Sequence, residues 1–209
     1  MRHAVAPLLL ASLLLAAPPA PAQPAATQAV AEEIGPWRLG CVTDRMTDRP
    51  ACQLRHRDWV ERPAATAPGL AFEVIERHGR LLPAVTARDL SLEGASRGLL
   101  AFTGTAQLRL DQNAMVEMPC GLEGRSLVCA PRAAEAERIA GELLQARRAL
   151  VRIAGLSGPQ GEPAELPLAE TRAALDRLRR LVPAGSAPAA PQGFDLPELL
   201  GRLQRLLMP

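Results

Sequence analysis

The sequence has no lysine and no tyrosine, and aromatic side chains make up only 2% of its 209 residues. All 24 basic residues are therefore arginine, which we attribute to the base composition of the genome rather than to function. Removing a predicted leader that contains Arg2 leaves 23 arginines against 22 acidic residues, a net charge of +1. So small an excess argues against a polyanion-binding surface, and we expect no nucleic acid partner.

The first hydrophobic run, Val5–Ala17, is too short to span a bilayer as a mature helix. It follows the basic residues Arg2 and His3 and precedes the small residues Ala20-Pro21-Ala22, so residues 1–22 are predicted to be a signal peptide cleaved near Ala22. No cysteine follows the run, which argues against a lipoprotein anchor. We expect the mature protein to be periplasmic or extracellular, in an oxidising environment where cysteines pair.

Residues suited to metal binding and nucleophilic catalysis are scarce. Only two histidines, His56 and His78, follow the predicted cleavage site, and cysteines of an oxidising compartment pair more often than they bind metal. Ser96, in the sequence GASRG, is not assigned as a nucleophile. We therefore expect neither a metal nor a cofactor.

One pair of side chains resembles part of a catalytic site. Alternation along a strand at Ala51–Val60 places His56 and Asp58 on one face beside Cys52, where the aspartate could orient the imidazole as a general base. A surface histidine beside an aspartate without a catalytic role is much commoner, and short motifs mislead. The chain is therefore predicted not to be an enzyme.

Composition divides the chain into five parts. The signal peptide is followed by a flexible N-terminal segment at 23–35 and a single domain at 36–182. A Pro/Ala linker, PAGSAPAAPQG, occupies 183–193, and an amphipathic helix is predicted at 194–208. The domain is long enough to bury a substantial core.

The second pair of cysteines fits a short β-hairpin. If Gly124-Arg125 forms a two-residue loop, Gly124 takes the position that requires a positive φ in a type II′ turn. Cys120 then faces Cys129 at a non-hydrogen-bonded pair, where the two Cα atoms lie about 4.5 Å apart. That separation falls within the range of disulfides.

The first pair of cysteines brackets a looser turn. Cys41 lies near the end of a predicted strand at Gly35–Val42, and Cys52 lies near the start of the next strand, Ala51–Val60. Four cysteines allow three connectivities, and the sequence does not exclude the other two. We favour Cys41 with Cys52 and Cys120 with Cys129, because each of these pairs encloses its own turn.

The predicted fold class is α+β, mainly antiparallel β, with six to eight short strands that form a sandwich or a partly open barrel. Two helices, Ala133–Leu150 and Leu168–Val182, are expected to pack on the strands. Besides the strands that carry the cysteines, short strands are predicted at Gly69–Arg77, Leu81–Val85, Gly98–Thr103, Ala106–Leu110, Leu150–Ala154 and Ala164–Leu166.

The order of motifs resembles a known family. In chain order these motifs are Trp37 before Cys41, the nearby Cys52, a strand ending in Asp111, the sequence Cys129-Ala130-Pro131, a helix, a strand and the closing PLAETRAALDRL. Over about Pro36–Val182 the chain is similar to the invasion-associated locus B family of exported bacterial proteins. The resemblance implies a periplasmic or surface protein of the envelope or of host-cell association, with no established catalytic residues.

Arg55, Arg57 and Trp59 share one face of the strand at Ala51–Val60. Arginine forks and an aromatic ring there could bind an anionic glycan, a lipid head group or a protein carboxylate. The commoner alternative is a solvated sheet face with the tryptophan packed over arginine stems. We treat these three residues as a candidate binding face.

The predicted C-terminal helix could dock on another surface. Six leucines recur in it at helical spacing: Leu196, Leu199, Leu200, Leu203, Leu206 and Leu207. So short a helix is marginal alone in water, so its leucines must be covered by a partner protein, an envelope or membrane surface, or the chain's own domain. The expected function is therefore non-catalytic binding of an envelope or host partner; the alternative is a hydrolase of cell-wall or envelope substrates.

Overall fold

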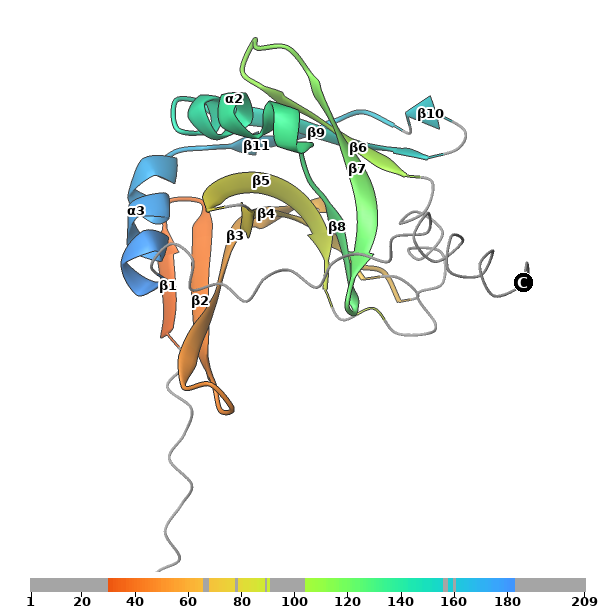
Figure 1. The fold of residues 1–209 in the computed structure, drawn as a ribbon. Helices are drawn as coiled ribbons and strands as arrows, with labels where there is room; N and C mark the ends of the chain where they lie inside the picture. Colours follow the sequence, from red (N-terminus) through yellow and green to blue (C-terminus); the bar gives the residue numbers. More distant parts are fainter. Residues whose placement is uncertain are drawn as a thin grey trace, which may run out of the picture.

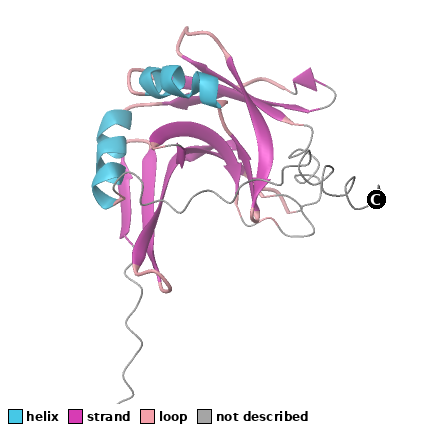
Figure 2. Cartoon of the chain, viewed as in Figure 1, coloured by secondary structure: helices cyan, strands magenta, loops and turns pink. Residues whose placement is uncertain are grey.

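The computed structural model describes residues 30–65, 68–77, 79–88, 90, 104–155, 158–159 and 161–182. The described part is mainly antiparallel β-structure with two helices, as the sequence predicts (Figure 2). Several predicted features lie outside these residues: the signal peptide at 1–22, the strand at 98–103, the linker at 183–193, the helix at 194–208, and His78.

Eleven strands in the described part form one open antiparallel sheet, more than the six to eight predicted. Their path runs β1-β2-β3-β4-β5-β8-β7-β6-β9-β10, and β11 pairs with β9 beside that path. Their bounds are β1 Val30–Ile34, β2 Trp37–Asp44, β3 Arg49–Glu61, β4 Leu70–Arg77, β5 Arg80–Ala87, β6 Thr105–Leu110, β7 Val116–Glu123, β8 Ser126–Cys129, β9 Arg148–Gly155, β10 Gly158–Pro159 and β11 Ala164–Pro167.

Strand β7 joins the two halves of the sheet. Its first half, from Val116 to Pro119, pairs with β6, and its second half, from Cys120 to Glu123, pairs with β8. The sheet bends strongly, and β5 forms an arch with α2, β6 and β9 above it (Figure 1). One bent sheet therefore supplies both layers, where a sandwich would use two separate sheets.

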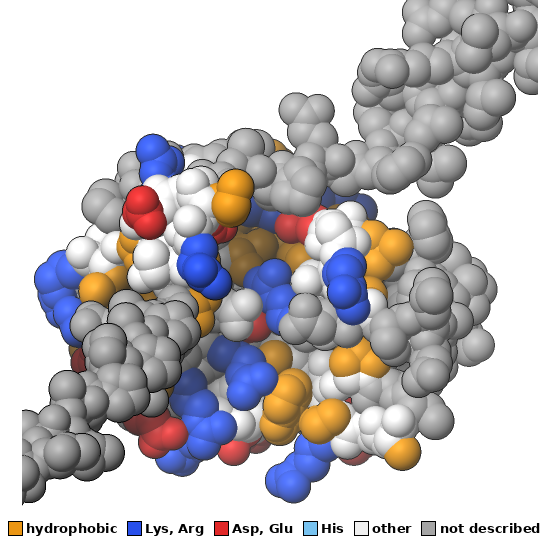
Figure 3. All heavy atoms as spheres, turned by 90° about the horizontal axis from the view of Figure 1, so that it is seen from below, with side chains coloured by type: hydrophobic (Ala, Val, Ile, Leu, Met, Phe, Trp, Pro, Cys, Tyr) orange, Lys and Arg blue, Asp and Glu red, His pale blue; other side chains and the backbone are white. Residues whose placement is uncertain are grey.

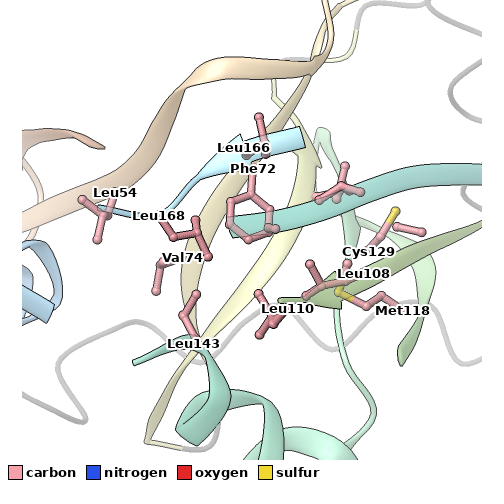
Figure 4. Close-up of a cluster of buried hydrophobic side chains, with 14 of the residues drawn as sticks. Leu54, Phe72, Val74, Leu108, Leu110, Met118, Cys129, Leu143, Leu166 and Leu168 are labelled. Carbon is pink, nitrogen blue, oxygen red and sulfur yellow. The ribbon is translucent and has the colours of Figure 1, made fainter. Parts of the chain in front are cut away.

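The main core lies on the upper side of the arch. Trp37 and Phe72 are fully buried there, with ring centroids 6.0 Å apart. Figure 4 shows how residues from distant elements converge in this cluster: Leu54, Phe72, Val74, Leu108, Leu110, Met118, Cys129, Leu143, Leu166 and Leu168. A smaller cluster of Ala84, Val128 and Ala130 is separate from it. It lies on the opposite face, because side chains alternate along each strand; we call this face the underside.

Both predicted disulfides are confirmed, each closing its own hairpin. Cys41 pairs with Cys52 across β2 and β3, and Cys120 pairs with Cys129 across β7 and β8. Their Cα atoms lie 4.0 and 3.9 Å apart, somewhat closer than the separation expected from strand geometry. Gly124 has φ of 59°, the positive value that the turn was predicted to need.

An additional strand, β1, precedes the predicted strand Gly35–Val42, which is observed as β2. Residues 30–34 lie in the segment 23–35, which is predicted to be flexible, yet they pair along their whole length with β2. Gly35, with φ of 57°, makes the tight turn between the two strands. The acidic residues Glu32 and Glu33 are not typical of a strand. Their charges are balanced in the fold, because Glu32 is ion-paired with Arg177 at 2.7 Å and Glu33 with Arg38 at 3.0 Å.

Helix α2, Ala133–Leu143, ends seven residues before the predicted Leu150. The Asp111 carboxylate accepts hydrogen bonds at 3.1 Å from the backbone N–H groups of Arg147 and Arg148. Strand β9 then begins at Arg148 and pairs with β6. Contacts from a remote segment therefore override a helical pattern that continues in the sequence.

Helix α3 spans Thr171–Leu181, within the predicted Leu168–Val182. Its Leu175 and Leu178 are buried as predicted, and Leu181 and Val182 are half-buried. Neither helix of the described part has the length and apolar character needed to cross a membrane.

Candidate functional site

The underside of the arch is the face that the two helices leave uncovered. In Figure 3 the molecule is seen from below, and arginine side chains surround a hollow whose depth contains hydrophobic side chains. Cross-strand partners point to the same side of a sheet, so the register gathers Arg55 of β3, Glu73 of β4 and Ala84 of β5 on this face. The candidate binding face predicted from the sequence thus forms part of the underside.

Arg55 and Trp59 form a stacked pair. The guanidinium carbon of Arg55 lies 4.5 Å from the centroid of the Trp59 ring. The pairing of β3 with β4 shifts register between these two residues, and the irregularity lets them meet. The ring also lies directly over Gly69, where a Cβ atom would approach it to 2.7 Å. Because Gly69 has no side chain, the indole of Trp59 can pack directly against its backbone.

Arg55 is surrounded by groups whose charges are already balanced. Opposite it on β2 is Arg38, paired with Glu33, and opposite it on β4 is Glu73, which pairs with Arg88. Within the described residues Arg55 has no carboxylate partner; its one described contact is with the indole. Its positive charge is therefore available to a ligand.

Arg57 does not join the stacked pair. Its side chain is exposed, and its nearest charged neighbour is Asp58, with Nε and Oδ2 3.9 Å apart. An exposed pair at that distance holds a side chain only weakly. Of the three predicted face residues, the structure brings Arg55 and Trp59 together and leaves Arg57 beside them as a solvated charge.

Two ion pairs that local sequence patterns do not predict lie deeper on the underside. Glu73 is 2% exposed and accepts hydrogen bonds from Nε and Nη2 of Arg88 at 3.1 and 2.6 Å. Arg77 pairs with Glu123 of β7, and burial lowers the pKa of its guanidinium. These four residues line a cavity of about 230 Å³. Glu73 stands out in the sequence as a charged residue within the apolar run of β4. Its partner Arg88 can be identified only once the strands are placed.

An apolar groove adjoins this cavity where the β2–β3 hairpin splays away from β4. It has a volume of about 650 Å³, and its walls include the Cys41–Cys52 disulfide, Leu81, Leu178 and Val182. The two hollows share Cys52, Gln53, Glu76 and Arg88, so they are continuous. This volume is in the range of ligand-binding pockets, and no local sequence pattern predicts the groove.

His56 is a core residue and not part of an exposed pair. It is 1% exposed, and its ring packs edge-on against Trp37 with centroids 5.5 Å apart. Nε2 lies 2.8 Å from the carbonyl oxygen of Pro167, and Nδ1 accepts the Asp58 backbone N–H at 3.0 Å. The Asp58 carboxylate is 3.9 Å from Nδ1. Both ring nitrogens are engaged by backbone groups, and the burial of His56 contradicts the expectation of a surface histidine beside an aspartate.

The segment 94–98 carries a motif that bears on the enzyme alternative. Gly94-Ala95-Ser96-Arg97-Gly98 does have the Gly-x-Ser-x-Gly spacing of a nucleophile elbow, so setting Ser96 aside was wrong on the pattern. These residues lie outside the described part, and the only described histidine is engaged in the core. Within the described residues, no group of three His, Cys, Asp or Glu side chains is arranged to hold a metal ion.

Comparisons with known proteins assign no family. No family model matches the chain, and neither a curated protein nor a solved structure matches it. Function must therefore be argued from the chemistry of the underside.

Proposed function

We propose that this protein is a non-catalytic exported binding module, which captures an anionic envelope or host partner through Arg55, Arg57 and Trp59. The observation that carries the proposal is the Arg55 guanidinium, stacked on Trp59 and without a carboxylate partner in the described part. A guanidinium forms strong, charge-assisted hydrogen bonds with carboxylates and phosphates. Stacking already holds it in place, so binding costs less side-chain entropy.

The compartment fits this role. Two disulfides indicate an oxidising, extracytoplasmic environment. A signal peptide at 1–22 would deliver the chain there, to the periplasm or the cell surface. Kinship with the invasion-associated locus B family belongs to the same proposal and is supported by the order of motifs alone, because no family model adds to it.

The test compares two double variants of the mature chain. Arg55→Gln with Arg57→Gln removes the charge of the face, and Arg109→Gln with Arg132→Gln removes equal charge from exposed positions on β6 and before α2. Each protein is immobilised and offered solubilised bacterial envelope at low and physiological salt. We expect the face variant to capture several-fold less material than the parent, and the control variant to capture about as much as the parent. The melting temperatures of both variants should stay near that of the parent.

Equal capture by both double variants would overturn the proposal, and so would a large loss of stability in the face variant alone. The hydrolase alternative is separated by treating the mature protein with a fluorophosphonate probe. We expect no labelling at Ser96; stoichiometric labelling there would favour an enzyme.

A further inference from the structure

The apolar groove beside the Cys41–Cys52 disulfide lacks a partner among the described residues. A second hollow of about 540 Å³, between α2, α3 and the β4–β5 hairpin, continues it and shares Glu76, Leu81 and Val182. Leucine side chains line the joint groove on α3 and β5. An apolar surface of this extent, open to water, favours an apolar occupant.

Charge in the groove does not select an ionic ligand. Arg88 is neutralised by Glu73 at 2.6 Å, so this basic side chain offers little free charge. Arg80, at the rim of the second hollow, lies 3.7 Å from Glu137. Because these two arginines are ion-paired within the domain, the groove suits an apolar ligand.

The chain itself supplies such an occupant. The described residues end at Val182, which lines both hollows, and 27 residues follow it. Eleven of them form the Pro/Ala linker at 183–193, which spans up to about 36 Å when extended. The leucine stripe of 194–208 comes next, and as a helix it would be about 22 Å long. The tether therefore begins at the groove and is long enough to turn back into it.

We propose that the leucine face of residues 194–208 docks in the apolar groove of its own domain, between the end of α3 and the β2–β3 hairpin. The contact would bury leucines such as Leu199 and Leu203 against Leu81 and Leu178. A short tether raises the effective concentration of the segment to the millimolar range, so a weak interface suffices. This inference concerns a different surface from the stacked pair, and either can fail without the other.

A photo-crosslinking experiment on the full mature chain tests the docking. A photoreactive amino acid replaces Leu203 on the stripe in one protein and Gln204 beside it in the other. We expect Leu203 to give intrachain cross-links, mapped by mass spectrometry to the end of α3 or to the β4–β5 hairpin, at a yield independent of protein concentration. The Gln204 position should give several-fold fewer.

A second measurement uses an apolar fluorescent dye. Leu199→Asp with Leu203→Asp should release the segment and raise dye binding several-fold, whereas Arg202→Asp with Arg205→Asp, off the stripe, should leave it unchanged. Cross-links only between two chains, cross-links only to added phosphatidylglycerol vesicles, or unchanged dye binding in the leucine variant would each overturn the proposal.

Discussion

At the scale of single residues, His56 shows how a buried polar group joins distant parts of the fold. Replacing it with Phe fills similar space but leaves the Pro167 carbonyl and the Asp58 N–H without their partners. We expect a loss of about 1–3 kcal/mol in the free energy of unfolding, measured by urea denaturation. Asp58→Asn should change it by less than about 0.5 kcal/mol, since that side chain is exposed. A comparable loss in both variants would show that the carboxylate matters.

Burial of His56 could have been predicted from the sequence. Strand alternation puts it on the same face as Cys52 and Leu54, and a face that carries a disulfide and a leucine points inward. Its acceptor, Pro167, could not have been predicted, because it lies 111 residues away. The same holds for the ion pair of Glu73 with Arg88, which depends on how β4 and β5 are curved.

At the scale of elements, Asp111 decides where α2 stops and β9 begins. It has φ of 50°, and its carboxylate accepts the N–H groups of Arg147 and Arg148. Asp111→Gly keeps the backbone conformation accessible but removes the acceptor, so we expect a loss of about 1–2 kcal/mol in urea denaturation. Asp111→Ala adds the penalty of positive φ and should cost about 1 kcal/mol more. A glycine variant as stable as the parent would show that the carboxylate contributes nothing.

Local sequence patterns predict most strands and hairpins, but they do not predict where the elements begin and end. The two-residue turn at Gly124, the cysteine register and strand β8 all rest on neighbours within ten residues. The end of α2 and the start of β1 depend on remote contacts, with Asp111 in one case and Arg177 in the other. Of the candidate site, the sequence predicts the shared face of the stacked pair, whereas the groove depends on how several strands and α3 are placed together.

At the scale of the whole molecule, the two disulfides fasten two separate hairpins of the sheet, β2–β3 and β7–β8. Cys120–Cys129 ties β7 to β8 at the point where the sheet passes from one half to the other. Replacing both of these cysteines with Ser should lower the free energy of unfolding by about 2–4 kcal/mol, measured by thermal or urea denaturation. Peptide mapping without reduction should recover only the two local pairs. Finding Cys41 joined to Cys129 would contradict the hairpin assignment.

The hydrogen bonds of Trp37 and His56 set the order in which the domain can be completed. The indole N–H of Trp37 donates to the hydroxyl of Thr171, 134 residues later, and His56 depends on Pro167. A chain delivered from its N-terminus, by a ribosome or through a channel, releases β1 to β5 first, and these hairpins can pair at once. The indole N–H of Trp37 and the ring of His56 meet these protein partners only when the last elements arrive. The early strands therefore cannot complete the core by themselves. A chain that is truncated before β11 lacks the partners of Trp37 and His56 and is unstable.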